Sequence, residues 1–75
     1  MSREMLSTMD IVKRHKVSYQ TVNYYTNLGL LTVRKKKGNT RYYKAGEVRR
    51  RLGDVAKFKN QGYSLKLIRS LIRSR

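Results

Sequence analysis

Apolar residues recur at helical spacing in four stretches of the chain, separated by polar caps and glycines. In the first stretch, Ser7 can cap a helix, and Asp10, three residues later, suits the positive end of that helix. Leu6 can then pack onto Ile11 as a hydrophobic staple. The pattern predicts a helix from about residue 8 to residue 14. Its apolar side is formed by Met9, Ile11 and Val12.

A second helix is predicted after a connection of only about three residues. Ser18 is its N-cap, with Thr21 three residues later, and Gly29 ends it just after residue 28. Two short helices joined this closely indicate a helix-turn-helix.

The two faces of the second helix differ in chemistry at about 100° per residue. The predicted core face contains Thr21, Val22, Tyr25 and Leu28. The opposite face contains Gln20, Asn23, Tyr24 and Asn27. Amide side chains both donate and accept hydrogen bonds, so this second face is suited to reading base edges. Tyr25 is predicted to lie in the core, and its neighbour Tyr24 to face a nucleic acid.

A short hairpin is predicted over residues 32–43, where β-branched and aromatic residues flank a Gly38-Asn39 turn. Its tip carries Lys35, Lys36 and Lys37. Tyr42 and Tyr43 point to opposite faces of a strand, so one is expected to pack and the other to be exposed. A two-stranded hairpin is unstable alone and must lean on the helices.

Two further helices complete the pattern, one over about residues 46–60 and one that begins after a Ser64 cap. The apolar stripe of the first consists of Val48, Leu52, Val55 and Ala56. That of the second consists of Leu65, Ile68, Leu71 and Ile72. No C-cap closes the last helix, so we expect the native chain to continue past Arg75. The fold predicted for the single domain 1–75 is mainly α. It is a winged helix-turn-helix with four helices and a two-stranded β-hairpin wing between helices 2 and 3.

The charge balance indicates a polyanionic partner, because 19 lysines and arginines stand against 4 acidic residues, giving a net charge of +15. Nucleic acid is the leading candidate, and an anionic membrane is the rival. No apolar run is long enough for a membrane span or a signal peptide, so we expect no membrane partner and a cytoplasmic, nucleoid-associated protein.

Enzymatic function is not expected, because the four acids show no paired spacing and no phosphate-binding glycine loop occurs. The absence of cysteine and the single His15 predict no disulfide, no metal site and no cofactor. His15 is interpreted as a plain surface residue. Arg49, Arg50 and Arg51 are either a solvated helix face or a second phosphate-binding patch.

Three ordered blocks of the chain resemble the N-terminal DNA-binding domain of MerR-type transcription regulators, over about residues 6–72. They are Val17-Ser18-x-x-Thr21-Val22-x-Tyr24-Tyr25 running into Gly29-Leu30-Leu31, then Gly38-x-x-Arg41-x-Tyr43, then Gly62-Tyr63-Ser64-Leu65 with Ile68. The resemblance implies that the recognition helix, about residues 18–28, enters the major groove of DNA. It also implies that the wing, 32–43, reaches the flanking backbone.

By the same resemblance, Ser18, Tyr19, Thr21, Asn23 and Tyr24 face DNA and Arg41 binds phosphate. Family members are homodimers joined by a helix beyond the part corresponding to residue 75, so we expect the full-length protein to dimerise and the isolated chain to be a monomer. The chain departs from the family pattern in having Asn23 for arginine, Lys16 for a turn glycine, and Lys44 at a cap position.

The partner predicted from all these observations is double-stranded DNA. The predicted DNA-binding residues are Ser18, Tyr19, Gln20, Thr21, Asn23, Tyr24, Asn27, Arg34, Lys35, Lys36, Lys37, Arg41 and Tyr43. The leading function is sequence-specific binding for transcription regulation. Two alternatives remain open: an excisionase-, partition- or nucleoid-type architectural role with a similar helix-turn-helix, and charge-driven RNA binding.

Overall fold

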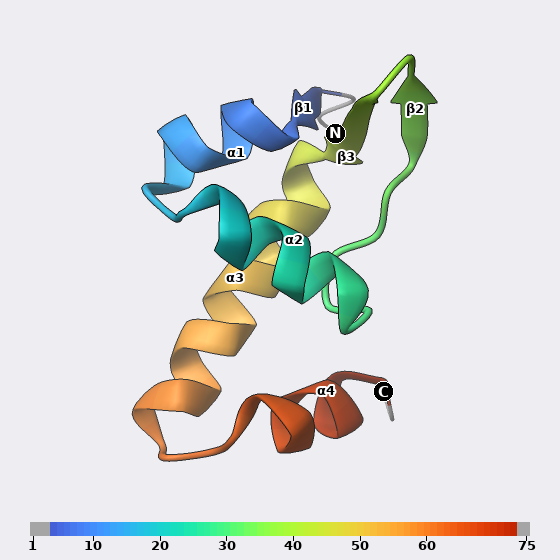
Figure 1. Cartoon of the computed structure of the whole chain (residues 1–75). Helices are drawn as coiled ribbons and strands as arrows, with labels where there is room; N and C mark the ends of the chain where they lie inside the picture. The colour runs from blue at the N-terminus through green and yellow to red at the C-terminus, as the bar shows by residue number, and fades with distance from the viewer. Residues whose placement is uncertain (1–3, 74–75) are drawn as a thin grey trace.

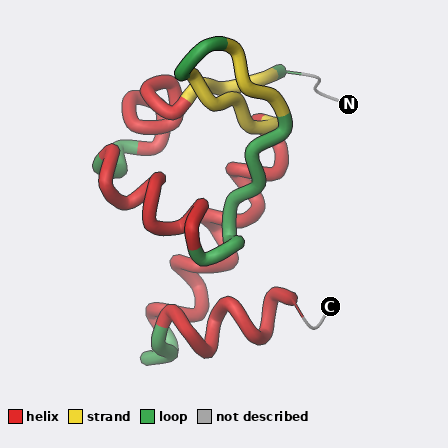
Figure 2. Tube along the Cα trace, turned by 45° about the vertical axis from the view of Figure 1, so that its right-hand side comes forward, coloured by secondary structure: helices red, strands yellow, loops and turns green. Residues whose placement is uncertain are grey.

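The computed structural model describes residues 4–73, which form four helices and a small antiparallel sheet. The elements in chain order are β1 (Met5–Ser7), α1 (Thr8–His15), α2 (Tyr19–Asn27), β2 (Lys35–Lys37), β3 (Thr40–Lys44), α3 (Ala45–Asn60) and α4 (Leu65–Arg73). The sheet lies at one end of the molecule and α4 at the other, with α3 running between them (Figure 1). The turned view shows the same separation (Figure 2). The predicted mainly α winged helix-turn-helix is confirmed.

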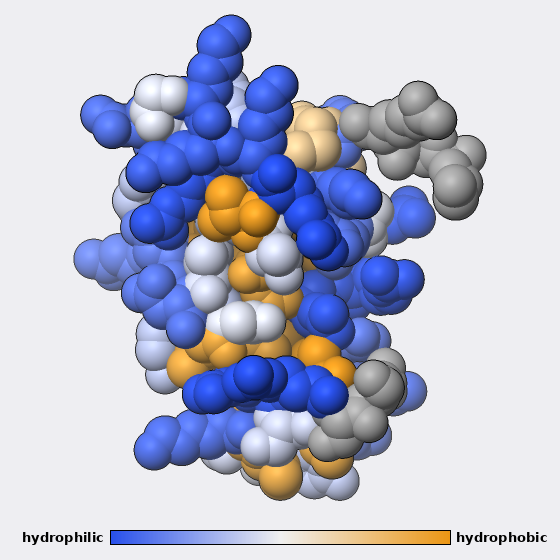
Figure 3. All heavy atoms as spheres, turned by 90° about the vertical axis from the view of Figure 1, so that its right-hand side faces the viewer, coloured by the Kyte–Doolittle hydropathy of each residue, from blue (hydrophilic) through white to orange (hydrophobic). Residues whose placement is uncertain are grey.

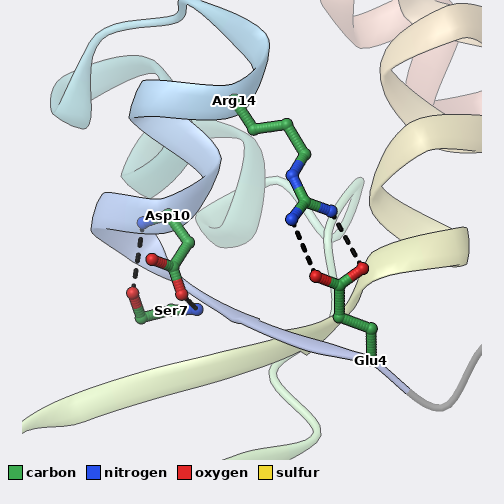
Figure 4. A network of polar contacts seen from close by, with 4 residues as sticks. All are labelled: Glu4, Ser7, Asp10 and Arg14. Carbon is green, nitrogen blue, oxygen red and sulfur yellow. Dashed lines mark hydrogen bonds and ion pairs between the residues drawn. The ribbon is translucent and has the colours of Figure 1, made fainter.

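The first two helices, α1 and α2, begin with the predicted serine caps. Ser7 Oγ accepts a hydrogen bond from the Asp10 backbone N–H, and Asp10 accepts one from the Ser7 backbone N–H, at 3.1 and 3.0 Å. Figure 4 shows this reciprocal pair, which lowers the pKa of the Asp10 carboxyl through the hydrogen bonds from Ser7. Ser18 Oγ accepts from the Thr21 backbone N–H at 3.0 Å. Lys16 adopts the left-handed conformation between the helices, with φ of 55°.

The wing differs from the predicted two-stranded hairpin, because it belongs to a three-stranded sheet in the order β1-β3-β2. β1 pairs antiparallel with β3, placing Leu6 opposite Tyr43. The backbone N–H of Ala45 also donates to the Glu4 carbonyl at 2.9 Å, which extends this link to the start of α3. The third strand gives the hairpin a support that two strands lack.

A single core joins the sheet to all four helices in the described chain. Its buried members are Leu6, Ile11, Val22, Tyr25, Leu30, Leu31, Tyr43, Ala45, Val48, Val55, Ile68 and Ile72. Tyr25 is buried and Tyr24 exposed, as the helical period predicted. Met9 and Ala56 were expected on apolar faces but are exposed, because their positions lie at the edges of those faces. No helix within residues 4–73 combines the length and apolar character needed to cross a membrane.

Candidate nucleic-acid interface

The predicted recognition helix α2 presents one buried and one accessible side. Val22 and Tyr25 pack into the core, whereas Tyr19, Gln20, Tyr24 and Asn27 are exposed and Asn23 is half-buried. Gly29, with φ of 82°, then reverses the chain toward the buried Leu30. A non-glycine residue is strained in this left-handed conformation, so glycine here directs the chain away from α2 and toward the wing.

A cleft of about 430 Å³ lies between α2, the wing and the start of α1. It is lined by Ser7, Thr8, Met9, Tyr19, Asn23, Asn27, Lys36, Asn39, Thr40 and Arg41. The lining contains three amide side chains and two cations, and it contains no carboxylate. Such a surface attracts a polyanion and offers it uncharged hydrogen-bonding groups at the same time.

The sequence predictions and the cleft overlap in five residues. Tyr19, Asn23, Asn27, Lys36 and Arg41 line the cleft together. Gln20, Tyr24, Lys35 and Lys37 are exposed but do not line it. The hydroxyls of Ser18 and Thr21 lie 2.7 Å apart and bond to each other, so their first role is to hold the start of α2.

The wing carries its lysines outward. Lys35, Lys36 and Lys37 are all exposed along β2, and Gly38 turns the chain with φ of 61°. Lys36 stands opposite Arg41 in the β2–β3 register. In the face shown in Figure 3, hydrophilic side chains dominate the upper part, where the wing lies, and apolar side chains gather below them. The wing therefore projects charge away from the apolar part of this face.

Arg34 is held by α3 in the structure. Its Nε and Nη2 atoms donate to the two carboxylate oxygens of Glu47 at 2.9 and 2.6 Å. These hydrogen bonds lower the pKa of Glu47 and raise the pKa of Arg34. Its predicted phosphate contact stays a prediction, and the bidentate carboxylate partner already occupies two of its five N–H donors.

The structure corrects the prediction for Tyr43. Its side chain is only 1% exposed, and its ring belongs to the core. The register places Tyr43 opposite Leu6, on the inner face of the sheet, so its ring is not available to touch DNA. Tyr42, next along the strand, takes the more accessible position. The sequence predicted that one of the two tyrosines would pack and the other would be exposed. Tyr43, which was predicted to contact DNA, is the one that packs.

Five residues of the cleft were missed by the sequence reasoning: Ser7 and Thr8 at the start of α1, then Met9, Asn39 and Thr40. Met9 is 50% exposed, and Asn39 and Thr40 belong to the wing turn. The polar Gly-Asn-Thr turn gave a local signal for the last two, because its amide and hydroxyl groups adjoin the lysines. Met9 gave none, because an apolar residue in an amphipathic helix is ordinarily assigned to the core.

Glu4 and Glu47 are each paired with an arginine. Glu4 binds Arg14 through two hydrogen bonds of 2.9 and 2.7 Å, as Figure 4 shows. These bonds lower the pKa of Glu4. Because Glu4 precedes β1 and Arg14 lies near the end of α1, the pair ties the two elements together. Neither this pair nor the pair of Arg34 and Glu47 places a carboxylate in the cleft.

Comparison with protein families gives a match over residues 6–75 to the family described as MerR HTH family regulatory protein. This span includes α1, α2, the wing, α3 and α4, and it covers every residue that lines the cleft. No curated protein matches the chain. No solved structure matches it either.

Proposed function

This chain belongs to the MerR HTH family of regulatory proteins, which bind DNA, and we propose that it reads specific duplex sequences with α2 in the major groove and the wing on the flanking backbone. The observation that carries the proposal is the shared cleft. The amides of α2 and the cations of the wing line the same carboxylate-free surface. A duplex lying there would meet base-reading groups and phosphate-binding groups together.

The dimensions of α2 support its assignment to the major groove. Nine residues give a helix about 13 Å long, and the major groove of B-form DNA admits an α-helix. Asn23 and Asn27 lie one turn apart on the side that lines the cleft. Their amides can each donate and accept, which is the pattern that pairs with adenine. Lys36 and Arg41 then hold the neighbouring phosphates and set the register of the helix.

Met9 adds an apolar surface to this polar cleft. Together with the exposed ring of Tyr19, it can cover a sugar or a thymine methyl group without requiring a hydrogen bond. Of the remaining predicted contacts, we assign Gln20 and Tyr24 to the groove and Lys35 and Lys37 to phosphates. We place the protein inside the cell on the ground of this partner.

Replacing Asn23 by alanine should change relative affinities among duplexes by about 1 to 3 kcal/mol at one or two base pairs, because an amide-to-base contact is lost. Replacing Lys36 by alanine should weaken all duplexes alike, since a phosphate contact carries no base identity. Binding titrations would compare a duplex selected from a randomised library with scrambled versions of it. An equal loss on all duplexes for Asn23→Ala would exclude the base-reading role. Equally tight binding of duplex RNA would favour the charge-driven alternative.

Residues 1–75 are expected to be monomeric without DNA. The buried side chains Ile68 and Ile72 direct the apolar stripe of α4 inward, and a net charge of +15 opposes association of two copies. Sedimentation equilibrium at moderate salt would give the mass directly. A tight dimer under these conditions would show that the exposed surface of this domain already supplies an interface.

A further inference from the structure

The recognition helix and the wing are joined by one side-chain hydrogen bond in the described part of the chain. The hydroxyls of Thr26 on α2 and Tyr43 on β3 lie 2.8 Å apart. Elsewhere β3 packs mainly against β1, β2, α1 and α3, while α2 packs mainly against α1. The ring of Tyr43 thus spans the space between the two elements that line the cleft.

The direction of this hydrogen bond follows from counting protons. The Thr26 hydroxyl has one proton, and it donates that proton to the Val22 carbonyl oxygen at 2.8 Å. Thr26 Oγ1 therefore acts as acceptor toward Tyr43, and the Tyr43 hydroxyl is the donor. The resulting chain runs from the sheet into the backbone of α2. Because the Tyr43 side chain is buried, water does not readily replace this link.

The two ends of this link lie beside proposed DNA contacts. Thr26 precedes Asn27 and follows Asn23 by three residues on α2, and Tyr43 follows Arg41 by two residues on β3. All three neighbours line the cleft. A change in the length of the link would therefore change the spacing between the amides and the wing cation.

We propose that Tyr43 is a positioning residue for sequence recognition, which sets the distance between α2 and the wing by donating its hydroxyl proton to Thr26. This inference rests on the proposed DNA-binding function. When the link is intact, a duplex that fits the amides of α2 also meets Arg41 at the correct separation. When the link is lost, each element still binds DNA, but the two no longer reinforce one another on the correct sequence.

The experiment replaces Tyr43 by phenylalanine, which keeps the buried ring and removes only the hydroxyl. Discrimination between the library-selected duplex and its scrambled version should fall about threefold to tenfold, the range that corresponds to one ordinary hydrogen bond. The salt dependence of binding should stay the same, because no phosphate contact is removed. Tyr42→Phe is the matched control, since it removes a hydroxyl from the same strand, and its discrimination should equal that of the wild type.

A double-mutant cycle with Thr26→Val separates positioning from general stability. Tyr43→Phe should cost much less discrimination in the Thr26→Val background than in the wild type. Thr26→Ser, which keeps the hydroxyl, should retain discrimination, and this comparison of serine with valine carries the same test if the phenylalanine variant does not fold. All titrations are made well below the melting temperature of each variant.

The outcome that overturns the inference is a wild type that discriminates between duplexes and a folded Tyr43→Phe variant that discriminates equally well. An additive cycle would also overturn it, because the two hydroxyls would then act independently. A wild type that binds both duplexes equally would instead reject the proposed sequence-specific function, so the two failures are distinguishable.

Discussion

Replacing Leu6 by alanine is expected to lower the free energy of unfolding by about 2 to 5 kcal/mol, the range for truncating a buried leucine. The Leu6 side chain is 2% exposed and lies opposite Tyr43 in the β1–β3 register. It also precedes the Ser7 cap of α1, so one cavity would disturb both the sheet and the first helix. A domain of 75 residues has about 4 to 11 kcal/mol of stability in total, so a large share can be lost.

Leu67→Ala provides a control with the same chemical change at a different depth. Its side chain is 45% exposed on α4, and we expect a change within about 0.5 kcal/mol. Urea unfolding followed by circular dichroism would measure both variants. Equal losses at the two leucines, or none at Leu6, would be incompatible with a strand β1 packed under the wing.

The helices were predictable because their signals are local. The Ser7 and Ser18 caps each act within one turn, and both capping hydrogen bonds form as the sequence indicated. The division of α2 between Tyr25 inside and Tyr24 outside follows from the helical period alone. Lys16, which stands where the family pattern has a turn glycine, adopts the left-handed conformation between these helices.

The third strand was not predictable from local pattern. β1 is only three residues long, and its partner β3 lies far along the chain, so no alternation or turn signal marks it. The pair of Arg34 and Glu47 is likewise non-local, joining residues 13 apart. Period-two alternation indicated that either Tyr42 or Tyr43 would be buried. Which of them is buried depends on where the core lies, and the non-local packing of β3 against β1, α1 and α3 determines that.

The sequence predicted the types of side chain in the candidate interface, but it did not predict the cleft in which they lie. Lysines at the wing and amides on α2 are visible in the sequence, and five predicted residues line one cleft. The contribution of Met9 depends on how α1 packs against α2 and β1, which residue patterns do not specify. Packing also buries the Tyr43 ring, so Tyr43 does not line the cleft and instead forms a hydrogen bond with Thr26 on α2.

Replacing Lys35, Lys36 and Lys37 together by alanine is expected to produce the largest loss of DNA binding. All three side chains are exposed on β2, at the edge of the sheet, where their removal leaves the core intact. Each phosphate contact contributes about 0.9 to the slope of log affinity against log salt, so three contacts contribute about 2.7. At a salt concentration of about 0.1 M this corresponds to a loss of roughly two to three powers of ten in affinity.

The control removes Lys13, Lys57 and Lys59, three exposed lysines of α1 and α3 that do not line the cleft. Each triple variant loses three positive charges, so a long-range effect of net charge would weaken DNA binding by both equally. If the wing lysines contact phosphates, the variant without Lys35, Lys36 and Lys37 flattens the slope of log affinity against log salt by about 2.7. The control variant then keeps nearly the wild-type slope. Salt titrations on one duplex would measure both. Equal slopes for the two variants would mean that phosphates respond to the total charge of the domain and not to the wing.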